Sequence, residues 1–196
     1  MNSGSDDFQS LGISAHVGQT EFEAGVGGGM KMKAAGGKKA LCVNHEVGNV
    51  ALDRRCAGFK KGFGGSVDIL GTSNDPTEIQ KAVAAKLGGG YDTILTLGAG
   101  LSGEAALKAL EAAGKVGNVK LGTFDMSPNM LKAAAAGKVE FLIDQQQYLQ
   151  GYLPIVIFSQ YMKWGVMPAG VVMTGPGFVT PSNASAVIKW AAQGYR

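Results

Sequence analysis

The sequence predicts an α/β protein built on a doubly wound, mostly parallel sheet. Short apolar runs alternate with helix-like patterns along most of the 196 residues, and helix start and stop signals stand between them. The 31 glycines, in an Ala-rich background, supply the tight turns and close helix–sheet packing of such folds. With 45% hydrophobic and 17% charged residues, the chain has enough apolar surface to bury a core, and we do not expect disorder.

The predicted elements follow one another as strand and helix. Strands are expected at 40–44, 67–70, 93–97, 119–124 and 139–143, and helices at 50–63, 76–87, 102–113 and 128–136. The turn chemistry agrees with these positions. Ser127 is placed as an N-cap with Pro128 at the first helical position, and Gly114 and Gly137 stand where helices should stop.

Both ends of the chain depart from this alternation. Residues 13–17 look like a short strand without a preceding helix partner. Residues 148–164 form a helical pattern with apolar side chains on nearly every side, namely Leu149, Tyr152, Leu153, Ile155, Val156, Ile157, Phe158, Tyr161 and Met162. A helix that is apolar all round should be buried on several faces. The rest of the chain offers little to cover it, so we infer that the polypeptide is part of something larger or self-associates.

Charge and hydropathy argue against several classes of partner. The formal charge of +3 comes from scattered lysines, most of them at predicted helix ends, so we expect no nucleic-acid partner. The longest apolar stretch, 153–158, is far shorter than the roughly 18 residues of a membrane-spanning helix, so no membrane insertion is expected. The N-terminus has neither a basic region nor an apolar region, so no secretory signal is expected in this chain.

Two cysteines, Cys42 and Cys56, lie in one predicted strand–loop–helix unit. Neither belongs to a Cys-x-x-Cys motif or a His-rich cluster, so we expect no metal site. Cysteine is among the most buried residue types, and the sequence supplies no geometry for a bond. We therefore favour two buried thiols over a disulfide.

A polar small-molecule site is predicted beyond the ends of two successive strands. Asp125 follows the strand at 119–124, and Gln145 follows the strand at 139–143. Sheets of this kind bind ligands outside the carboxyl ends of their strands. An Asp in this position is usually a helix cap, but Ser127 already fills that role. Gln145 is the weaker candidate, because a polar run follows it and such runs are normally exposed.

Arg55 is a third candidate, on the first turns of the helix at 50–63. Its planar fork of donors would reach over the strand ends toward hydroxyl or carboxylate oxygens. The alternative is a solvated helix arginine paired with Asp53. Arg54 is adjacent and should point elsewhere, so only one of the two arginines faces a cleft.

A competing interpretation is a dinucleotide-binding oxidoreductase domain. The run Gly98-Ala99-Gly100-Leu101-Ser102-Gly103 is a full G-x-G-x-x-G between a predicted strand and helix, with Asp125 at the next strand end. Against it, the motif lies on the third strand–helix unit, and Asp125 is farther away than the usual ~20 residues. A glycine turn that lets a helix pack closely explains the run more simply. His16 and His45 stand alone without a catalytic constellation, so we expect neither catalysis nor a cofactor.

The ordered series of motifs at 49–59, 106–114, 122–125 and 143–145 resembles the type I periplasmic sugar-binding proteins of ABC transporters, the ribose-binding-like group. The resemblance implies two similar lobes that close over a sugar or polyol, and a periplasmic protein that signals to an ABC permease without catalysis. The same fold serves as the effector domain of LacI-type repressors. No helix-turn-helix or basic segment is present here, which argues against that second alternative.

The resemblance also implies roles for particular residues. Arg55, Asp125 and Gln145 match ligand-contacting positions of the family, and Asn49, at the start of the first motif, joins them as a ligand-binding candidate. Asn2 and Ser3 match a contact pair on the first lobe. One departure is plain, because Leu97-Gly98-Ala99-Gly100 stands where family members often have an asparagine. Backbone groups or Ser102 would replace that contact.

The resemblance divides the chain into four parts: a remnant of the first lobe at 1–18, a second-lobe α/β domain at 19–145, a first-lobe-type apolar helix at 146–168, and a return segment with a C-terminal helix at 169–196. Residues 18–19 and 145–147 would be hinge crossings. Relative to the family, the chain lacks most of the first lobe. We therefore expect impaired ligand binding, since half the contacts are gone, and a homodimer formed through residues 148–164.

Overall fold

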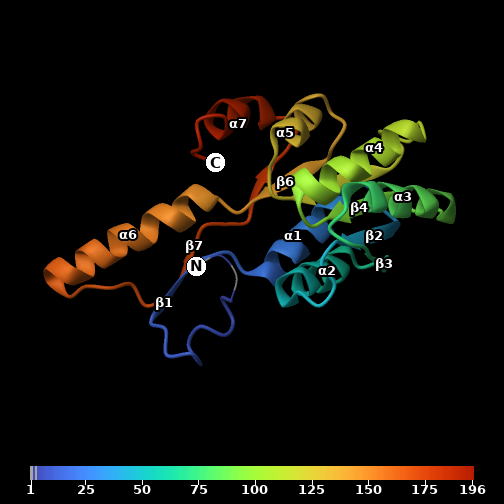
Figure 1. Ribbon diagram of the computed structural model, residues 1–196. Helices are drawn as coiled ribbons and strands as arrows, with labels where there is room; N and C mark the ends of the chain where they lie inside the picture. Colours follow the sequence, from blue (N-terminus) through green and yellow to red (C-terminus); the bar gives the residue numbers. More distant parts are fainter. Residues whose placement is uncertain (1, 3) are drawn as a thin grey trace.

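The computed structural model describes residue 2 and residues 4–196, and its main body is a six-stranded sheet (Figure 1). The strand order is β3-β2-β4-β5-β6-β8. Five of these strands are parallel: β2 (Lys39–Asn44), β3 (Ser66–Gly71), β4 (Thr93–Thr96), β5 (Lys120–Phe124) and β6 (Phe141–Asp144). The sixth, β8 (Gly177–Val179), is antiparallel to β6. The predicted parallel α/β class is confirmed.

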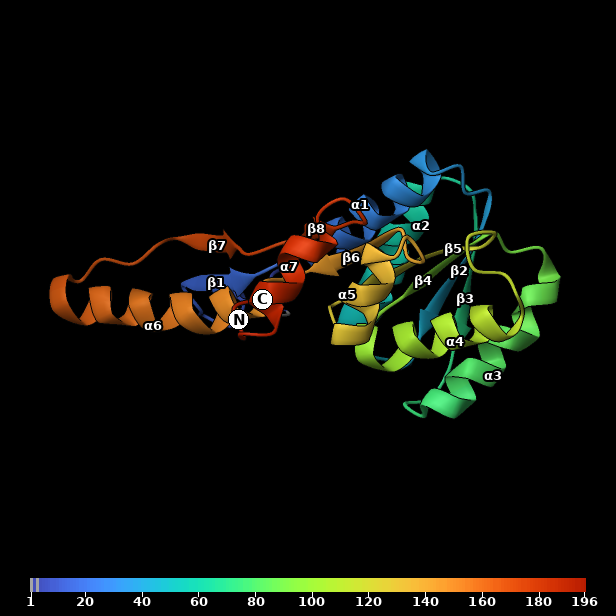
Figure 2. The same ribbon diagram turned by 90° about the horizontal axis from the view of Figure 1, so that it is seen from above.

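Helices cover both faces of this sheet (Figure 2). On one face, α1 (Glu21–Ala34) and α2 (Val50–Phe63) pack on a core that includes Cys42, Phe124 and Phe141. On the other face lie α3 (Pro76–Lys86), α4 (Glu104–Ala112), α5 (Pro128–Ala135) and α7 (Ala184–Ala191). Alternate residues of each strand face opposite layers, and both layers are apolar because a parallel sheet is buried on both sides.

Caps set the helix boundaries. The Ser127 Oγ accepts from the Met130 amide at the start of α5, as predicted, and Pro128 is the first residue of that helix. The Asp75 carboxylate caps α3 in the same way, again ahead of a proline. Two short turns complete the body: a 3₁₀ turn at Leu87–Gly89 and a π-helical turn at Ala99–Gly103, which occupies the start of the helix expected at 102–113.

The sequence patterns did not reveal α1, because four glycines interrupt it and glycine is a poor helix former. The structure explains these glycines by contact with α2. A Cβ atom at Gly25 or Gly29 would collide with the α2 backbone at Arg55 or Phe59. The missing side chains therefore let the two helices approach backbone to backbone.

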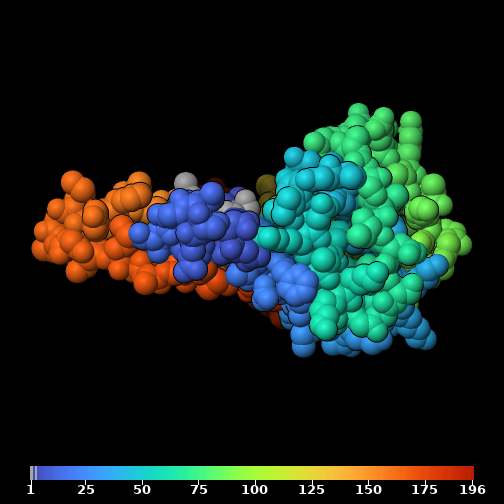
Figure 3. Space-filling model, turned by 90° about the horizontal axis from the view of Figure 1, so that it is seen from below, coloured from blue at the N-terminus to red at the C-terminus, as the bar shows by residue number. Residues whose placement is uncertain are grey.

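A second, smaller unit projects from the body, and we call it the arm (Figures 2 and 3). It consists of a two-stranded parallel sheet, β1 (Ala15–Gly18) and β7 (Gly170–Met173), and the helix α6 (Gln147–Trp164). β1 overlaps the strand expected at 13–17, whereas the short strands β7 and β8 were not predicted. Among the described residues, no helix is long and apolar enough to cross a membrane.

The apolar surface of α6 is uncovered. Gln150 is its one buried residue, while large apolar side chains on several sides are exposed, namely Tyr148, Tyr152, Ile155, Phe158, Tyr161, Met162 and Trp164. Ile155 is 69% exposed and Met162 is 81% exposed. The helix is therefore much more exposed than its apolar sequence predicts.

The chain crosses between the arm and the body three times: from β1 to α1, from β6 to α6 and from β7 to β8. Hydrogen bonds join these crossings to one another. The Thr174 amide donates to the Gly18 carbonyl at 2.9 Å. The Gln145 carbonyl accepts from the Thr174 hydroxyl at 2.7 Å and from the Gln150 side chain at 3.1 Å. Thr174 and Gln150 are both buried, so these bonds fix where Gln145 sits at the end of β6.

The expectation of two free thiols is wrong, because Cys42 and Cys56 form a disulfide. Cys42 lies on the face of β2 that α2 covers, and Cys56 lies on the buried side of α2. Their Cα atoms are 5.9 Å apart, within the usual range for a bridge. The pairing depends on the angle at which α2 returns over β2, which residue spacing alone does not give.

Candidate functional site

The carboxyl ends of the parallel strands bring polar side chains to one edge of the six-stranded sheet. His45 follows β2, Asp125 follows β5 and Gln145 follows β6, while Arg55 reaches the end of β4 from α2. Three of these residues, Arg55, Asp125 and Gln145, are predicted site residues. The structure adds His45 and Glu21, which sequence reasoning did not select. We call these five residues the edge cluster.

Arg55 is buried and held on three sides. Its Nε donates to Glu21 Oε2 at 2.5 Å, its Nη2 donates to Glu21 Oε1 at 3.3 Å, and its Nη1 donates to the Leu97 carbonyl at 3.2 Å. The guanidinium carbon lies 4.4 Å from the centroid of the Phe124 ring. The alternative of a solvated arginine paired with Asp53 is therefore wrong, since Asp53 instead accepts from Asn44. Arg55 stands as a preoriented donor fork.

Glu21, the partner of Arg55, is the first residue of α1 and is only 4% exposed. The helix start favours a carboxylate, and Gln19 donates a further hydrogen bond to it at 3.3 Å. Acidic residues are favoured in the first turn of a helix, so Glu21 could have been selected from the sequence if this helix had been predicted. It was missed because α1 itself was not recognised.

Asp125 has an unusual backbone conformation. Its φ of 65° lies in the left-handed region, which Asp tolerates better than most residues. Its Oδ1 accepts from the Gln145 side chain and, at 3.2 Å, from the Gln147 side chain. Burial raises the pKa of the Asp125 carboxyl, and this outweighs the opposing effects of the Arg55 charge and the Gln145 hydrogen bond.

Gln145 is buried, contrary to the exposed polar run that was its alternative. Its Nε2 donates to Asp125, while its Oε1 is buried and has no hydrogen-bond partner among the described residues. Gln19 Oε1, at the crossing from β1 to α1, is also buried and also has no hydrogen-bond partner among the described residues. A buried amide oxygen without a donor costs about 1–3 kcal/mol, so each of these oxygens is an unsatisfied acceptor among the described residues.

Asn49 is the N-cap residue of α2. Its Oδ1 accepts from the amides of Ala51 and Leu52 and so caps α2, while its Nδ2 donates to Glu46 at 3.0 Å. Asn49 also lines a cavity of about 220 Å³ with Glu21, Arg54 and the N-terminal segment. Its role in ligand contact stays a prediction.

The first-lobe candidates lie next to the crossing at Gly18. The Asn2 amide donates to the Val17 carbonyl at 3.0 Å, and Asn2 pairs with Gly18 as an isolated bridge. Ser3, the other member of the predicted pair, lies outside the described residues. Arg54 pairs with Asp6 at 2.8 Å, and within the described residues it forms no hydrogen bond with the edge cluster, whereas Arg55 is bonded to Glu21.

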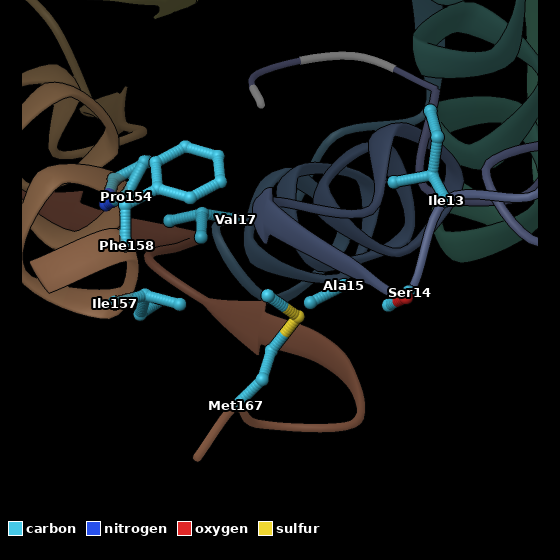
Figure 4. Close-up of a pocket in the computed structure, with 8 residues that line it drawn as sticks. All are labelled: Ile13, Ser14, Ala15, Val17, Pro154, Ile157, Phe158 and Met167. Carbon is cyan, nitrogen blue, oxygen red and sulfur yellow. The ribbon is translucent and has the colours of Figure 1, made fainter. Parts of the chain in front are cut away.

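A separate cavity of about 430 Å³ lies in the arm between β1 and α6 (Figure 4). Its lining is almost wholly apolar: Ile13, Ser14, Ala15, Val17, Pro154, Ile157, Phe158 and Met167. Such a lining lacks the donors and acceptors that a polyhydroxylated ligand needs. The cavity belongs to the uncovered apolar surface of the arm and lies apart from the edge cluster.

The glycine run at 98–103 forms a π-helical turn, and two of its amides are bonded within that turn. The amides of Ser102 and Gly103 both donate to the Gly98 carbonyl, at 3.0 and 2.8 Å. A pyrophosphate is held by free amides at this place in a dinucleotide site. These two amides are already used within the turn.

The profile of the family described as "Periplasmic binding protein domain" matches residues 6–165. The chain belongs to this family. Periplasmic binding proteins are solute-binding proteins, and nothing found here supports the dinucleotide-binding or repressor alternatives.

Solved structures of a carbohydrate transporter and of a periplasmic ribose ABC transporter agree with the fold. A carbohydrate transporter from Acidothermus cellulolyticus, in complex with myo-inositol, is 34% identical, with a TM-score of 0.90 over 100% of this chain and 69% of that chain. The periplasmic ribose ABC transporter from Conexibacter woesei is 19% identical, with a TM-score of 0.82 over 94% of this chain and 65% of that chain. The second likeness concerns the fold alone.

A curated relative matches part of the sequence. The xylose/arabinose-binding protein XylF of Sulfolobus acidocaldarius is 34% identical over 68 residues, which is 34% of this chain and 17% of that protein. This periplasmic binding protein chain thus spans about two thirds of the solved chains and a small part of the curated one.

Proposed function

We propose that the edge cluster is part of the binding site for a sugar or polyol, and that the chain acts in solute binding without catalysis. The observation that carries this is the buried Gln145 amide, which donates to Asp125 and leaves its own oxygen without a donor. A ligand hydroxyl can donate to that oxygen, which removes the cost of its burial. The myo-inositol complex of the similar carbohydrate transporter supports a polyhydroxylated ligand.

The chemistry of the cluster suits neighbouring hydroxyl groups. Each hydroxyl both donates and accepts, so it needs an acceptor and a donor side by side. Asp125 and Gln145 supply acceptors, and the two Arg55 N–H groups that Glu21 and Leu97 do not use supply donors. Because Arg55 is fixed by Glu21 and Leu97, little side-chain freedom is lost when a ligand binds.

The whole protein would deliver its ligand to the permease of an ABC transporter in the periplasm. The Cys42–Cys56 disulfide supports a compartment outside the cytoplasm, where disulfides persist. We propose that residues 1–18 and 146–168 belong to a first lobe and residues 19–145 to a second, with 169–196 as the return segment. Asn2, Ser3 and Asn49 would then add contacts across the cleft. With this share of the site, the chain should bind weakly.

A second part of the proposal concerns the arm. We propose that two copies of the chain associate through the exposed face of α6 and the open edges of the β1–β7 sheet. Ile155, Phe158 and Met162 expose large apolar surfaces there, beside the cavity of about 430 Å³. Burying such a patch against a second copy removes it from water.

Multi-angle light scattering tests this association. We expect a dimer at micromolar concentration, and we expect Ile155→Lys and Met162→Lys to shift it toward the monomer. Met30→Lys is the control, because Met30 is 61% exposed on α1, away from the arm. A wild-type chain that stays monomeric, or a Met30→Lys effect as large as that of Ile155→Lys, would contradict the proposal.

A thermal-shift panel tests the binding function. Ligands that bind the folded chain alone raise its melting temperature by mass action. We expect stabilisation by myo-inositol, ribose, xylose or arabinose at tens of millimolar, and none by NAD(H). Stabilisation by NAD(H) and by no sugar or polyol would overturn the proposal.

A further inference from the structure

We propose that His45 is a ligand-contacting residue of the edge cluster, that Ser102 is its positioning residue, and that the cluster selects uncharged polyols over sugar acids. This inference rests on the proposed function and deepens it. His45 follows β2, two strands away from Asp125 in the sheet order, at the same carboxyl edge.

Ser102 orients the imidazole. The Ser102 side chain is fully buried, and its Oγ donates its one proton to the Gly98 carbonyl at 3.0 Å. The same Oγ lies 3.3 Å from His45 Nδ1. With the hydroxyl proton given to the Gly98 carbonyl, we assign Nδ1–H as the donor to the Ser102 oxygen. The opposite ring nitrogen, Nε2, is then an acceptor in the neutral ring.

Nε2 is free to accept a hydrogen bond from a ligand. Within the described part of the chain, no protein group forms a hydrogen bond with it. Burial lowers the pKa of His45 and outweighs the opposing charges of Glu46 and Asp125, while the Arg55 charge adds to the lowering, so the ring is neutral at neutral pH. The ring lies beside Gly98, which directly follows Leu97, and the Leu97 carbonyl accepts from Arg55.

Gly98 makes room for the ring. A Cβ atom at this position would lie 3.2 Å from His45 Cε1 and 3.6 Å from Nε2. The imidazole would have to shift by a few tenths of an ångström to accept a side chain here. The packing of His45 thus explains the first glycine of the G-x-G-x-x-G run without a bound nucleotide.

The cluster is rich in acceptors and in negative charge. His45 Nε2, the Gln145 Oε1 and the Asp125 carboxylate all accept, and Glu21 already neutralises Arg55. Hydroxyl groups of an uncharged polyol donate to such acceptors, whereas the carboxylate of a sugar acid meets the charge of Asp125 with no unpaired cation in the cluster.

Two isosteric variants separate ligand contact from a structural role. In His45→Gln the side-chain amide reaches the place of Nε2, and in His45→Asn it reaches the place of Nδ1 and keeps the Ser102 contact. We expect the asparagine variant to lose about 3- to 10-fold in myo-inositol affinity, the range of one hydrogen bond, and the glutamine variant to lose less. A merely structural histidine gives the opposite order.

Imidazole ¹⁵N spectra read the contact directly. The chain has two histidines, so His16→Gln assigns both sets of signals. We expect Nδ1 of His45 to be protonated in the free chain and to lose this preference in Ser102→Ala. Myo-inositol added to about 100 mM, enough for a millimolar-range Kd, should shift the His45 Nε2 signal and leave His16 unchanged. Glucuronate at the same concentration should not shift it.

The outcomes are distinguishable. If myo-inositol shifts the backbone amides of Asp125 and Gln145 but not the His45 ring, and His45→Asn binds like wild type, the inference about His45 is wrong and the proposed function stands. If glucuronate binds as well as myo-inositol, the selection for uncharged ligands is wrong. If neither of these compounds, nor ribose, xylose or arabinose, shifts any signal, the proposed function fails, and the inference fails with it.

Discussion

Arg196 donates two hydrogen bonds to one carboxylate oxygen of Asp144, from Nε at 2.8 Å and from Nη2 at 2.6 Å. Asp144 is fully buried and ends β6, directly before Gln145. Its other oxygen accepts from the Gln146 amide at 2.7 Å. The last residue of the chain therefore holds the strand end that carries a predicted ligand residue.

Arg196→Ala should destabilise the fold, because it leaves a buried carboxylate with a single hydrogen bond from a backbone amide. We expect a loss of about 1–3 kcal/mol in the free energy of unfolding, measured by urea denaturation. Lys108→Ala is the control, since Lys108 is exposed on α4. Equal midpoints for both variants would show that the Arg196–Asp144 contact does not hold β6.

Arg55→Ala and Arg54→Ala should differ sharply although the residues are adjacent. Removal of Arg55 leaves Glu21 buried without its charge partner, which costs about 3–5 kcal/mol. Arg54 pairs with Asp6 at a half-exposed position, so its loss costs less than about 1 kcal/mol. Denaturation curves of both variants check this. Adding Glu21→Gln to Arg55→Ala should recover part of the loss, and no recovery would argue against the burial cost as its cause.

Asp125→Asn should raise the melting temperature at neutral pH while weakening ligand binding. Burial raises the folded-state pKa of Asp125, so the folded chain holds this proton more tightly than the unfolded chain. Its contribution to stability is therefore greatest at low pH and is lost as pH rises from the unfolded to the folded pKa. Asparagine removes the buried charge, keeps the Oδ1 acceptor and tolerates the left-handed backbone. A gain on the order of 1 kcal/mol corresponds to about 2–4 °C.

Asp75→Asn is a control in which the expected change in melting temperature at neutral pH has the opposite sign. The backbone amides of Glu78 and Thr77 lower the pKa of the Asp75 carboxyl, so its contribution is present at neutral pH and fades as pH falls through the folded pKa. We expect this variant to melt lower at neutral pH, with little difference from wild type in acid. A melting temperature for Asp125→Asn below that of wild type at pH 7 would contradict the sign worked out for Asp125.

Loss of the Cys42–Cys56 disulfide should destabilise the chain without changing the fold. The bridge closes a loop with a sequence separation of 14, and closing a loop of about 15 residues is worth about 3 kcal/mol in the chain-entropy account. The double variant Cys42→Ala/Cys56→Ala should show this loss in urea. Alkylation of the unreduced, denatured wild-type protein, read by mass spectrometry, should modify neither cysteine, and modification of both would show that the bridge is absent.

The alternation of strands and helices was predictable, because apolar period and capping residues are local signals. The helix at Val50–Phe63 and the cap at Ser127 match their expected places. α1 was not predictable in this way, since its glycines have meaning only against the backbone of α2. β7 and β8 are too short to show a pattern, and each is defined by a partner strand far away in the sequence.

The candidate site was predictable in part for the same reason. Asp125 and Gln145 stand out because they follow apolar strands, and Arg55 because it lies on the first turns of a predicted helix. The ion pair of Arg55 with Glu21 spans 34 residues, and the contact of His45 with Ser102 spans 57. Both depend on how helices return over the sheet, and no local pattern encodes that angle.

Backbone amide shifts of the ¹⁵N-labelled chain during a myo-inositol titration test the central claim most directly. The account predicts saturable shifts at the carboxyl edge of the sheet, centred on His45, Gly98, Asp125 and Gln145, and their loss in Asp125→Ala. Shifts confined to the apolar cavity of the arm around Val17 and Ile157, or no shifts at all, would contradict it.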